Sequence, residues 1–482
     1  MEPIKVKEIV EAVNGSLLQG DENREITFVT TNSKEVKEGT LFVPIIGERV
    51  DGHNYIASAF ELGGVAVFAS RHETNDLDSE HVYIQVENTL LALQKLGAYY
   101  RNKFTIPVIG ITGSVGKTTT KEMISAALET KKQVLKTAGN MNSQVGLPLM
   151  MLRLEAQHDI AVIEMGMSEP GEMSRLAKIA RPDTAVVTNI GVSHIGQLGS
   201  QENIRSEKLN IINEFPLQNG RLYLNGDDIL LCELRKDKRN QISLSQETKE
   251  KLEECQLFYF GINDTCEYYA EDIKVVGDET HFTYHSPSGM EEIILSVLGL
   301  HNVGNAMVAL AIAEQYGITP ASAKEGLRNY KPIAMRGQIF ESNGLKIIDD
   351  SYNASPDSMK SGVQVLLQME QVKRRIAVLA DVLELGELSY QCHYDVGRYI
   401  AFAGLDGKVI DEVVTIGEES KAITKAIEQE NKQIVAHSFC SNEEAIAYLS
   451  EKVSSGDAIL VKGSRGMHTE EIVAALKNHN NV

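Results

Sequence analysis

Glycines, a lysine and threonines follow one another along residues 110–119, which read Gly-Ile-Thr-Gly-Ser-Val-Gly-Lys-Thr-Thr. Such glycines let the backbone turn so that its N–H groups point at phosphate oxygens, while Lys117 adds a positive charge and Thr118 offers a hydroxyl to Mg²⁺. The strict phosphate-loop pattern has glycine where this chain has Ile111, and here that glycine comes one residue earlier, at Gly110. The segment predicts a variant nucleotide-binding loop; a glycine-rich turn without a ligand is the weaker alternative.

Two further side chains follow apolar runs typical of buried strands. Glu164 ends the run 159–164, and His194 comes shortly after the run 184–190. A carboxylate at the carboxyl end of a strand, beside a phosphate loop, is well placed to hold Mg²⁺. On these residues alone, a capping or solvated glutamate and a hydrogen-bonding histidine are the stronger interpretations.

The elements that must position these residues are apolar strands alternating with helices. From Ile106, strand patterns at 107–112, 159–164 and 184–190 are separated by helical stretches, of which 117–129 follows the loop directly. From near Arg336, strand patterns recur at 345–350, 375–380, 412–416 and 457–461. Such alternation predicts an α/β fold with two parallel sheets, each covered by helices on both faces. The segment 241–296 holds short polar strands of no predicted topology, and a helix is expected over 90–104.

Composition excludes several classes of protein. The 482 residues carry a formal net charge of −20, and no basic patch stands out, so a nucleic-acid partner is not expected. The five cysteines have irregular spacing without a Cys-x-x-Cys pair, which argues against a zinc site or a disulfide framework. Neither a signal-peptide core nor an apolar run of about 18 residues is present. We therefore expect a cytoplasmic protein without membrane insertion.

The loop Thr112–Thr119 resembles the nucleotide loop of the Mur ligases and folylpolyglutamate synthetases, which make amide bonds through acyl phosphates. The resemblance covers almost the whole chain and implies the three-domain Mur ligase architecture. A UDP-sugar-binding domain is expected at 1–105 and a central ATP-binding domain, with a P-loop-type parallel sheet, at 106–334. A Rossmann-like domain binding ATP and the incoming dipeptide is expected at 335–482. The family also favours a monomer.

The same resemblance implies roles for residues around the loop. The family's metal ligands match Glu164, His194 and Lys208, the last as a carbamate formed with CO₂, which is a hard oxygen ligand suited to Mg²⁺. Without the resemblance, Lys208 reads as a solvated helix lysine. The catalytic residues implied are Lys117, Glu164, His194, Lys208 and Arg336. Those implied to hold magnesium are Thr118, Glu164, His194 and carbamylated Lys208.

Other segments match the parts of the family that contact ATP. Asn302 and Asn305 match the segment beside adenine, although Asn302 as a helix N-cap is an equally good interpretation. A surface linker arginine is the alternative for Arg336, and a strand end with a helix cap before Pro356 is the alternative for residues 349–356. The ATP-binding residues implied are Gly113, Ser114, Val115, Gly116, Lys117, Thr118, Thr119, Asn302, Asn305, Arg336, Asp350, Tyr352 and Asn353.

The substrates follow from further motifs. Asp-Asp-Ser-Tyr-Asn-Ala-Ser-Pro at 349–356 resembles the branch of the family that adds D-alanyl-D-alanine to UDP-N-acetylmuramoyl-tripeptide, and residues 462–467 match a late segment of that branch. Residues 381–386 resemble another of its segments, with Ala380 and Val382 replacing a glycine and a methionine. Lys34 replaces a common arginine, and Ser143 replaces a common asparagine. The substrate-binding residues implied are Ser33, Lys34, Asn140, Asn142, Ser143, Lys462 and Ser464.

The resulting hypothesis is an ATP- and Mg²⁺-dependent ligase that activates the tripeptide carboxylate as an acyl phosphate. Another Mur ligase or a folylpolyglutamate synthetase is the first alternative, and the motif at 349–356 weighs against it. A P-loop motor or switch NTPase is the second, disfavoured by the displaced glycine. A non-catalytic ATP-binding scaffold would not need the combination of Lys117, Glu164, His194 and Lys208. The sequence leaves open whether the third residue of the peptide is L-lysine or diaminopimelate.

Overall fold

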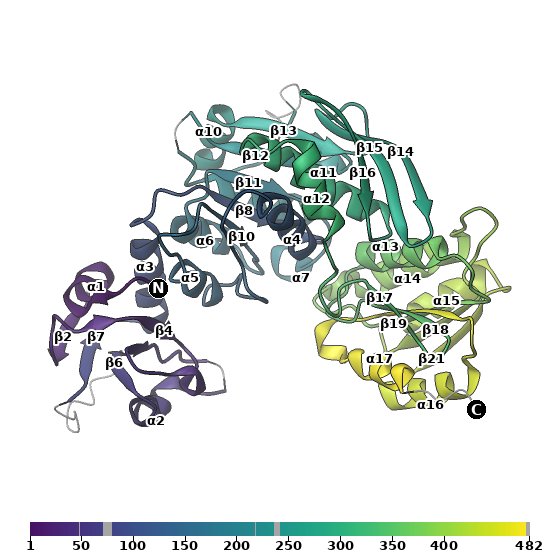
Figure 1. Cartoon of the computed structure of the whole chain (residues 1–482). Helices are drawn as coiled ribbons and strands as arrows, with labels where there is room; N and C mark the ends of the chain where they lie inside the picture. The colour runs from purple at the N-terminus through teal and green to yellow at the C-terminus, as the bar shows by residue number, and fades with distance from the viewer. Residues whose placement is uncertain (48, 71–79, 217, 236–241, 479–482) are drawn as a thin grey trace.

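The computed structural model describes residues 1–47, 49–70, 80–216, 218–235 and 242–478. It contains three large sheets, of five, nine and six strands, which follow one another along the chain. Figure 1 shows the three resulting lobes as an arch, with the nine-stranded lobe at the top and the other two on either side below it. Among the described residues no helix is long and apolar enough to cross a membrane. The α/β prediction is confirmed.

The N-terminal lobe is built on a five-stranded sheet of order β2-β7-β6-β5-β4, in which β2 alone runs antiparallel to its neighbour. A short β1-β3 pair lies beside it. Its elements are β1 (Ile4–Lys5), α1 (Val6–Val13), β2 (Ser16–Gln19), β3 (Glu25–Ile26), β4 (Phe28–Thr30), η1 (Ser33–Glu35), β5 (Thr40–Phe42), η2 (Gly52–Tyr55), α2 (Ile56–Glu61), β6 (Gly64–Ala69), β7 (Val82–Gln85) and α3 (Thr89–Arg101).

Helix α3 joins this lobe to the next one and packs on both, against α1 on one side and against α5 and α6 on the other. Its last residue, Arg101, is buried and donates to three backbone carbonyls, those of Phe104, Ile106 and Ala180, at 2.7, 3.1 and 2.9 Å. Gly97 lets α3 approach Pro148, because a Cβ there would lie 2.7 Å from that proline. The connection is therefore a packed helix.

The central lobe holds a sheet of order β16-β15-β14-β13-β12-β11-β8-β10-β9, parallel from β9 to β14. Its first elements are β8 (Val108–Thr112), α4 (Lys117–Leu128), β9 (Val134–Lys136), α5 (Gly146–Met151), β10 (Ile160–Glu164), α6 (Glu172–Ala180), β11 (Thr184–Val187), α7 (Ile195–Leu198), α8 (Gln201–Leu209) and η4 (Asn210–Ile212). The later ones are β12 (Arg221–Asn225), α9 (Ile229–Cys232), α10 (Gln246–Glu254), β13 (Gln256–Gly261), β14 (Tyr268–Val276), β15 (Glu279–Ser286), β16 (Gly289–Leu295), α11 (Leu300–Gln315) and α12 (Pro320–Arg328).

Successive residues of the central strand β8 pack into different hydrophobic cores, one on each face of the sheet. Ile109 and Ile111 of β8 pack with α4 and α11, whereas Val108 packs with the opposite core, which includes α5 and α6. This two-sided burial explains the nearly continuous apolar strands of the sequence. The polar segment 241–296 forms an antiparallel extension of the same sheet, β14-β15-β16, after α10 and β13; Gln241 lies outside the described residues.

The C-terminal lobe has a sheet of order β17-β18-β22-β19-β20-β21, parallel except for β17. Helices α16 and α17 pack on one face, and α13, α14 and α15 pack on the other. Its elements are β17 (Gln338–Ser342), β18 (Leu345–Asp349), α13 (Pro356–Gln368), β19 (Arg375–Ala380), η6 (Gly386–Leu388), α14 (Ser389–Phe402), β20 (Glu412–Ile416), α15 (Lys421–Glu430), β21 (Val435–Phe439), α16 (Asn442–Lys452), β22 (Ala458–Lys462), η7 (Arg465–Met467) and α17 (Glu470–Lys477).

Candidate active site between the central and C-terminal lobes

The phosphate loop connects β8 to α4, as its sequence predicts. Gly116 caps α4 with a φ of +87°, and Gly113 has a φ of +146°. A Cβ on Gly113 would lie 1.9 Å from the Thr188 hydroxyl, so only glycine fits there. Thr118 and Thr119 lie in the first turn of α4, where free N–H groups point out of the helix end. The loop therefore has the shape and the donors that an anionic ligand requires.

Residues 188–191, directly after β11, hold the phosphate loop in place by hydrogen bonds. The Asn189 side-chain oxygen accepts the N–H groups of Ser114 and Val115 at 3.0 and 2.8 Å, and its carbonyl accepts that of Ser114 at 3.1 Å. Thr188 donates to the Val115 carbonyl at 2.5 Å, and the Gly191 N–H donates to the Ser114 hydroxyl at 2.9 Å. Sequence reasoning missed Asn189, because its role depends on a contact between distant segments.

Lys117 folds back over the loop, and its amine donates to the Gly113 carbonyl at 2.8 Å. Burial lowers the pKa of this amine, the negative charge of Glu164 opposes that shift, and the positive charge of Arg336 adds to it. Arg336, from the segment after α12, is thus close enough to act electrostatically on the loop lysine. Two cationic groups from different parts of the chain converge on the place where phosphates are expected.

Glu164 lies beside the loop at the end of β10 and is 3% exposed. Its two carboxylate oxygens accept from the Thr118 hydroxyl at 2.9 Å and from the Asn142 amide at 2.7 Å. Its own N–H donates to Thr137 at 2.8 Å. A buried carboxylate and a hydroxyl in contact form a pair of hard oxygen donors next to the phosphate loop.

Lys208 lies in α8 and is 2% exposed, so it is not the solvated lysine that its helix pattern alone suggests. Within the described part of the chain its amine makes no hydrogen bond or ion pair. Burial first, and then the charge of Lys117, hold the pKa of Lys208 well below its ordinary value, whereas Glu207 opposes the shift. The folded protein therefore disfavours the charged form of this amine near the phosphate loop.

His194 precedes α7 and faces the C-terminal lobe. It has a left-handed backbone with a φ of +63°, and its Nδ1 lies 2.6 Å from a carboxylate oxygen of Glu384. Burial lowers the pKa of His194, the charge of Glu384 opposes this, and those of Lys208 and Lys117 add to it. The three predicted residues His194, Lys208 and Lys117 are thus electrostatic neighbours, and Glu384 is a neighbour that was not predicted.

The predicted adenine segment begins α11. Gly299 is the N-cap of this helix, so the interpretation of Asn302 as the cap is wrong: Asn302 lies inside the first turn and donates to the Leu298 carbonyl at 2.7 Å. Asn305 is buried and accepts from Thr120 of α4 at 2.8 Å. Asn305 therefore links α11 to the helix that follows the phosphate loop.

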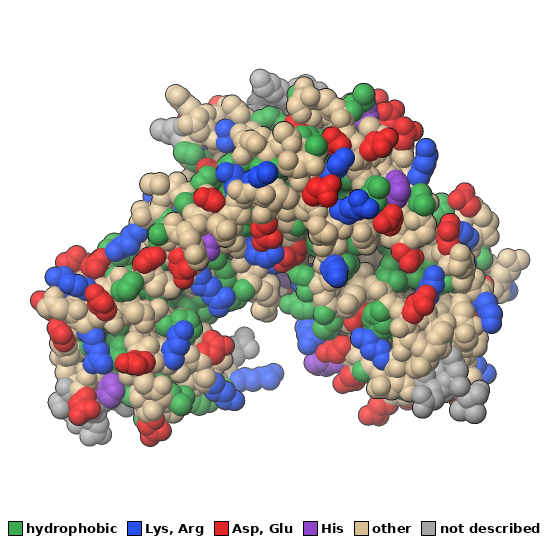
Figure 2. Space-filling model, viewed as in Figure 1, with side chains coloured by type: hydrophobic (Ala, Val, Ile, Leu, Met, Phe, Trp, Pro, Cys, Tyr) green, Lys and Arg blue, Asp and Glu red, His purple; other side chains and the backbone are tan. Residues whose placement is uncertain are grey.

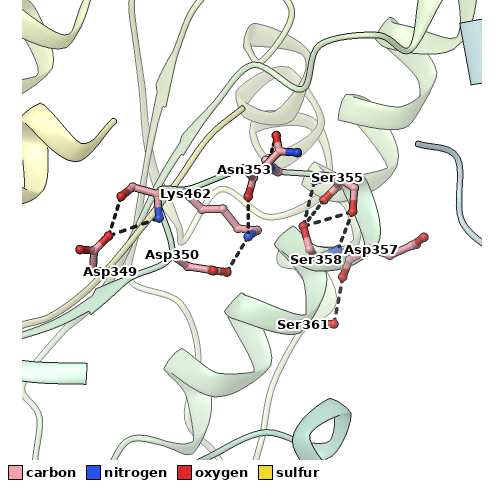
Figure 3. A network of polar contacts seen from close by, with 10 residues as sticks. Asp349, Asp350, Asn353, Ser355, Asp357, Ser358, Ser361 and Lys462 are labelled. Carbon is pink, nitrogen blue, oxygen red and sulfur yellow. Dashed lines mark hydrogen bonds and ion pairs between the residues drawn. The ribbon is translucent and has the colours of Figure 1, made fainter. Parts of the chain in front are cut away.

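In the C-terminal lobe a buried lysine organises the segment after β18. Lys462, 3% exposed at the end of β22, donates to the Asp350 carboxylate at 2.5 Å and to the Asn353 carbonyl at 3.0 Å. Figure 3 shows Lys462 reaching between these two residues. Ser355, rather than Asn353, caps α13. The cluster places exposed Asn353 at the carboxyl ends of β18 and β22, where ligands bind in sheets of this kind.

Tyr352 connects this cluster to the segment by which the chain enters the C-terminal lobe. The guanidinium of Arg336 lies 4.0 Å from the centre of its ring, and that of Arg465 lies 5.9 Å away. The Tyr352 N–H donates to the carbonyl of Met335 at 3.0 Å. Arg336 is therefore not a free linker arginine, because its charge is held between the phosphate loop and the ring of Tyr352.

The predicted substrate residues are spread over all three lobes. Asn140 and Ser143 are exposed on the turn between β9 and α5, from which Asn142 reaches Glu164. Ser33 and Lys34 form η1 of the N-terminal lobe, and no contact joins them to the loop among the described residues. Ser464 accepts the Leu383 N–H at 2.9 Å and so supports the segment that carries Glu384. Figure 2 shows a deep recess between the two lower lobes.

No group of three His, Cys, Asp or Glu side chains close enough to hold a metal by themselves occurs in the described ranges. The predicted magnesium ligands include only two side chains of these four types, Glu164 and His194. The other two predicted ligands are the Thr118 hydroxyl and the Lys208 side chain. The arrangement can bind a nucleotide's phosphates and surround them with Lys117, Arg336 and Glu164. Its chemistry suits phosphoryl transfer to a second substrate held between lobes.

Comparisons with known proteins agree with this arrangement. Three family profiles match consecutive parts of the chain: "Mur ligase family, catalytic domain" at 25–101, "Mur ligase middle domain" at 111–313 and "Mur ligase, glutamate ligase domain" at 335–465. The UDP-N-acetylmuramoyl-tripeptide–D-alanyl-D-alanine ligase of Bacillus subtilis (strain 168) is 40% identical over 475 residues, which is 98% of both chains.

Solved structures give the same result. The crystal structure of MurF from Acinetobacter baumannii superposes with a TM-score of 0.86 at 30% identity, covering 99% of both chains. MurF ligase from Thermotoga maritima in complex with ADP has a TM-score of 0.79 at 29% identity, covering 94% of this chain and 97% of that one. With its full-length relatives, its three profiles and its three lobes, this chain belongs to the Mur ligase family.

Proposed function

We propose that this ligase joins D-alanyl-D-alanine to UDP-N-acetylmuramoyl-tripeptide with the free energy of ATP hydrolysis, giving the pentapeptide precursor of peptidoglycan. The 40% identity to a ligase of that name over 98% of both chains carries the proposal. The motif at 349–356, whose Asp350 and Asn353 surround Lys462, supports this branch over another Mur ligase or a folylpolyglutamate synthetase. We place the reaction in the cytoplasm, where ATP is available, and expect a monomer.

The domain boundaries proposed are 1–105, 106–334 and 335–482, and each range contains one large sheet. ATP would bind with its phosphates on residues 113–119 and its adenine near Asn302 and Asn305, while the C-terminal lobe adds Arg336, Asp350, Tyr352 and Asn353. The sugar-peptide would extend from Ser33 and Lys34 along the recess to Asn140, Asn142 and Ser143. Lys462 and Ser464 shape the region that receives the dipeptide.

Two steps follow from this arrangement. The terminal carboxylate of the tripeptide attacks the γ-phosphorus of ATP, which gives an acyl phosphate and ADP. The loop N–H groups, Lys117 and Arg336 stabilise the charge on the transferring phosphoryl group. The amine of D-alanyl-D-alanine then attacks the acyl carbon, loses a proton and expels phosphate. Because water would hydrolyse the acyl phosphate, closure of the C-terminal lobe over the loop must exclude it.

Magnesium fits the donors around Glu164. The Thr118 hydroxyl and the buried Glu164 carboxylate are in contact at 2.9 Å, and both are hard oxygen ligands. His194 and Lys208 would hold a second ion. When bound, magnesium supplies neutralisation of phosphate charge and alignment of the phosphoryl oxygens. The protein's own part is to hold these donors in place through Asn142 and Thr137.

We propose that Lys208 carries a carbamate formed with CO₂. The neutral amine attacks CO₂, forms an N–C bond and releases a proton, and the resulting anion faces Lys117. Its burial, its lowered pKa and the absence of a partner among the described residues support this modification. A carbamate would replace an unpartnered amine with an anion that pairs with Lys117 and with magnesium.

The experiment measures phosphate release from ATP and Mg²⁺ with each UDP-N-acetylmuramoyl-tripeptide, L-lysine or diaminopimelate at position three, with and without D-alanyl-D-alanine. Product mass is determined in the same reaction. Phosphate release that requires both substrates, with the mass of a pentapeptide, establishes the ligase and identifies the third residue. Release without either substrate would favour a switch NTPase, and no turnover with either tripeptide would favour another ligase of the family. Lys117→Ala is the control for contaminating phosphatase.

A further inference from the structure

The incoming dipeptide presents a chemical problem to this site. At neutral pH its amino group is an ammonium ion. The phosphate side of the site is lined by Lys117 and Arg336, which suit phosphates and repel an ammonium ion. A binding group of opposite charge must therefore bring the amine to the acyl phosphate. This binding group must come from the C-terminal lobe, which faces the phosphate loop.

Glu384 is the carboxylate of the C-terminal lobe that lies beside His194, at 2.6 Å from Nδ1. Its side chain is 54% exposed, so much of the carboxylate remains open to solvent. Among the described residues no lysine or arginine forms an ion pair with it. Glu384 is therefore an anion held at the reaction site without a permanent cationic partner.

The backbone around Glu384 is built to hold it there. Glu384 has a φ of +67°, a conformation that is strained for a glutamate. The preceding N–H groups of Val382 and Leu383 donate to His393 Nε2 and to the Ser464 hydroxyl, both at 2.9 Å, while Leu385 is buried. Such strain persists only where the surroundings fix it, and it is common at binding sites.

The two lobes also meet at this point. The Glu384 carbonyl accepts the Gly196 N–H at 3.4 Å, and a Cβ on Gly386 would lie 3.4 Å from Gly196 Cα. The segment that carries Glu384 thus reaches the central lobe at α7, immediately after His194. A second carboxylate of the same lobe, Asp357, lies instead against Gly191, whose N–H donates to Ser114 of the phosphate loop. In Figure 3 its side chain points away from the polar network.

We propose that Glu384 binds the ammonium group of the incoming D-alanyl-D-alanine and orients its nitrogen toward the acyl carbon. This inference rests on the proposed function. Glu384 would be a substrate-binding residue, contributed by the C-terminal lobe, whose negative charge selects an amine. The charge is the property that matters, so the isosteric Glu384→Gln variant tests it and the Glu384→Asp variant retains it.

The first measurement is steady-state kinetics of the full chain. We expect Glu384→Gln to raise the KM for D-alanyl-D-alanine at least tenfold, the effect of losing one charged hydrogen bond, with the KM for ATP changed less than twofold. Glu384→Asp should recover part of the loss. Glu387→Gln, an exposed carboxylate three residues further along, is the matched control and should change neither constant.

The second measurement separates dipeptide binding from a role in orienting His194. Acyl-phosphate formation without dipeptide is followed by positional isotope exchange in heavy-oxygen-labelled ATP with UDP-tripeptide. We expect normal exchange in Glu384→Gln, because this step needs no amine. Loss of exchange with an unchanged KM for the dipeptide would overturn the proposal and make Glu384 a positioning residue for His194.

The third measurement is binding of D-alanyl-D-alanine and of propionyl-D-alanine, which lacks the amino group, to enzyme loaded with UDP-tripeptide and a non-hydrolysable ATP analogue. The unaltered chain should prefer the dipeptide about tenfold, and Glu384→Gln should lose that preference. Retained preference in Glu384→Gln, or its loss in Asp357→Asn instead, would overturn the proposal. If the unaltered chain makes no pentapeptide at all, the proposed function fails and this inference fails with it, whereas pentapeptide formation with a retained preference in Glu384→Gln overturns this inference alone.

Discussion

At the scale of single residues, the least usual group is a buried lysine amine without a partner. Burial and then the charge of Lys117 lower the pKa of Lys208 in the folded protein, so between the lowered pKa and the ordinary one the unfolded chain binds a proton that the folded chain does not. The free energy of unfolding therefore rises with pH from the lowered pKa up to the ordinary one. Removing the amine should stabilise the fold at neutral pH and remove the proposed magnesium ligand.

We expect Lys208→Met to raise the melting temperature at pH 7, with the gain shrinking as the pH approaches 10, and to lower ligation at least a hundredfold. Thermal unfolding at several pH values and the ligation assay measure the two effects. Lys131→Met, at an exposed position, is the control for losing a lysine. Full activity in Lys208→Met, or indifference of the unaltered enzyme to removal and return of bicarbonate, would contradict the carbamate.

Asn189 supports a second prediction. Asn189→Ala leaves the N–H groups of Ser114 and Val115 without their side-chain acceptor, which costs about 1 kcal/mol for a typical hydrogen bond. We expect the KM for ATP to rise about fivefold, because the loop is no longer held in its binding shape. Asn329→Ala, which removes an exposed bond to Glu325, should leave the KM unchanged. An unaltered KM in Asn189→Ala would show that Thr188 and the glycines suffice.

Single residues also show where sequence reasoning ends. Lys117, Thr118 and Glu164 could be found because each stands next to an apolar strand and the loop brings them together. The role of Asn189 could not, because it depends on contacts between segments far apart in the chain. Glu384 belongs to the recognised segment 381–386, but for the same reason its place beside His194 could not be predicted. The sequence allows Asn302 as an alternative cap of α11, whereas the chain turns one residue before Leu300, at Gly299, whose φ of +101° suits glycine.

At the scale of elements, burial decides which strands the sequence reveals. β10, β11, β19 and β22 are buried along their whole length and appear as apolar runs. β17 and β21 are edge strands with partly exposed residues, and neither was predicted. The antiparallel extension β14-β15-β16 alternates buried and exposed residues, so its polar positions obscure it.

Helix α13 gives a prediction at this scale. Ser355 accepts the Ser358 N–H at 3.3 Å and completes a capping box before Pro356. Ser355→Ala should therefore destabilise the first turn by about 1 kcal/mol. Faster hydrogen exchange of the α13 amides, measured by mass spectrometry, is the expected result. Ser361→Ala, further along the same helix, should leave the exchange unchanged; equal exchange in both variants would mean that Pro356 alone sets the helix start.

At the scale of the whole molecule, the N-terminal lobe is fixed to the central one by α3. Gly97→Val puts a branched side chain where a Cβ alone lies 2.7 Å from Pro148. We expect a lower melting temperature and a KM for UDP-tripeptide raised severalfold, with nucleotide affinity within twofold, because the loop lies in the central lobe. Binding of ADP and of UDP-tripeptide, measured separately by calorimetry, tests this. Equal losses for both ligands would mean that the lobes are coupled throughout.

The order of strands in the C-terminal sheet has a consequence for biosynthesis. β22 lies between β18 and β19, although it is the last of these strands to be made. During translation β18 and β19 emerge before the strand that pairs with both of them. The sheet can be completed only when residues 458–462 leave the ribosome. Lys462, which orders Asp350 and Asn353, arrives with that strand. A nascent chain therefore completes its phosphate loop long before the segment of Asp350 and Asn353 is ordered, and we expect a chain stopped before β22 to lack ligase activity.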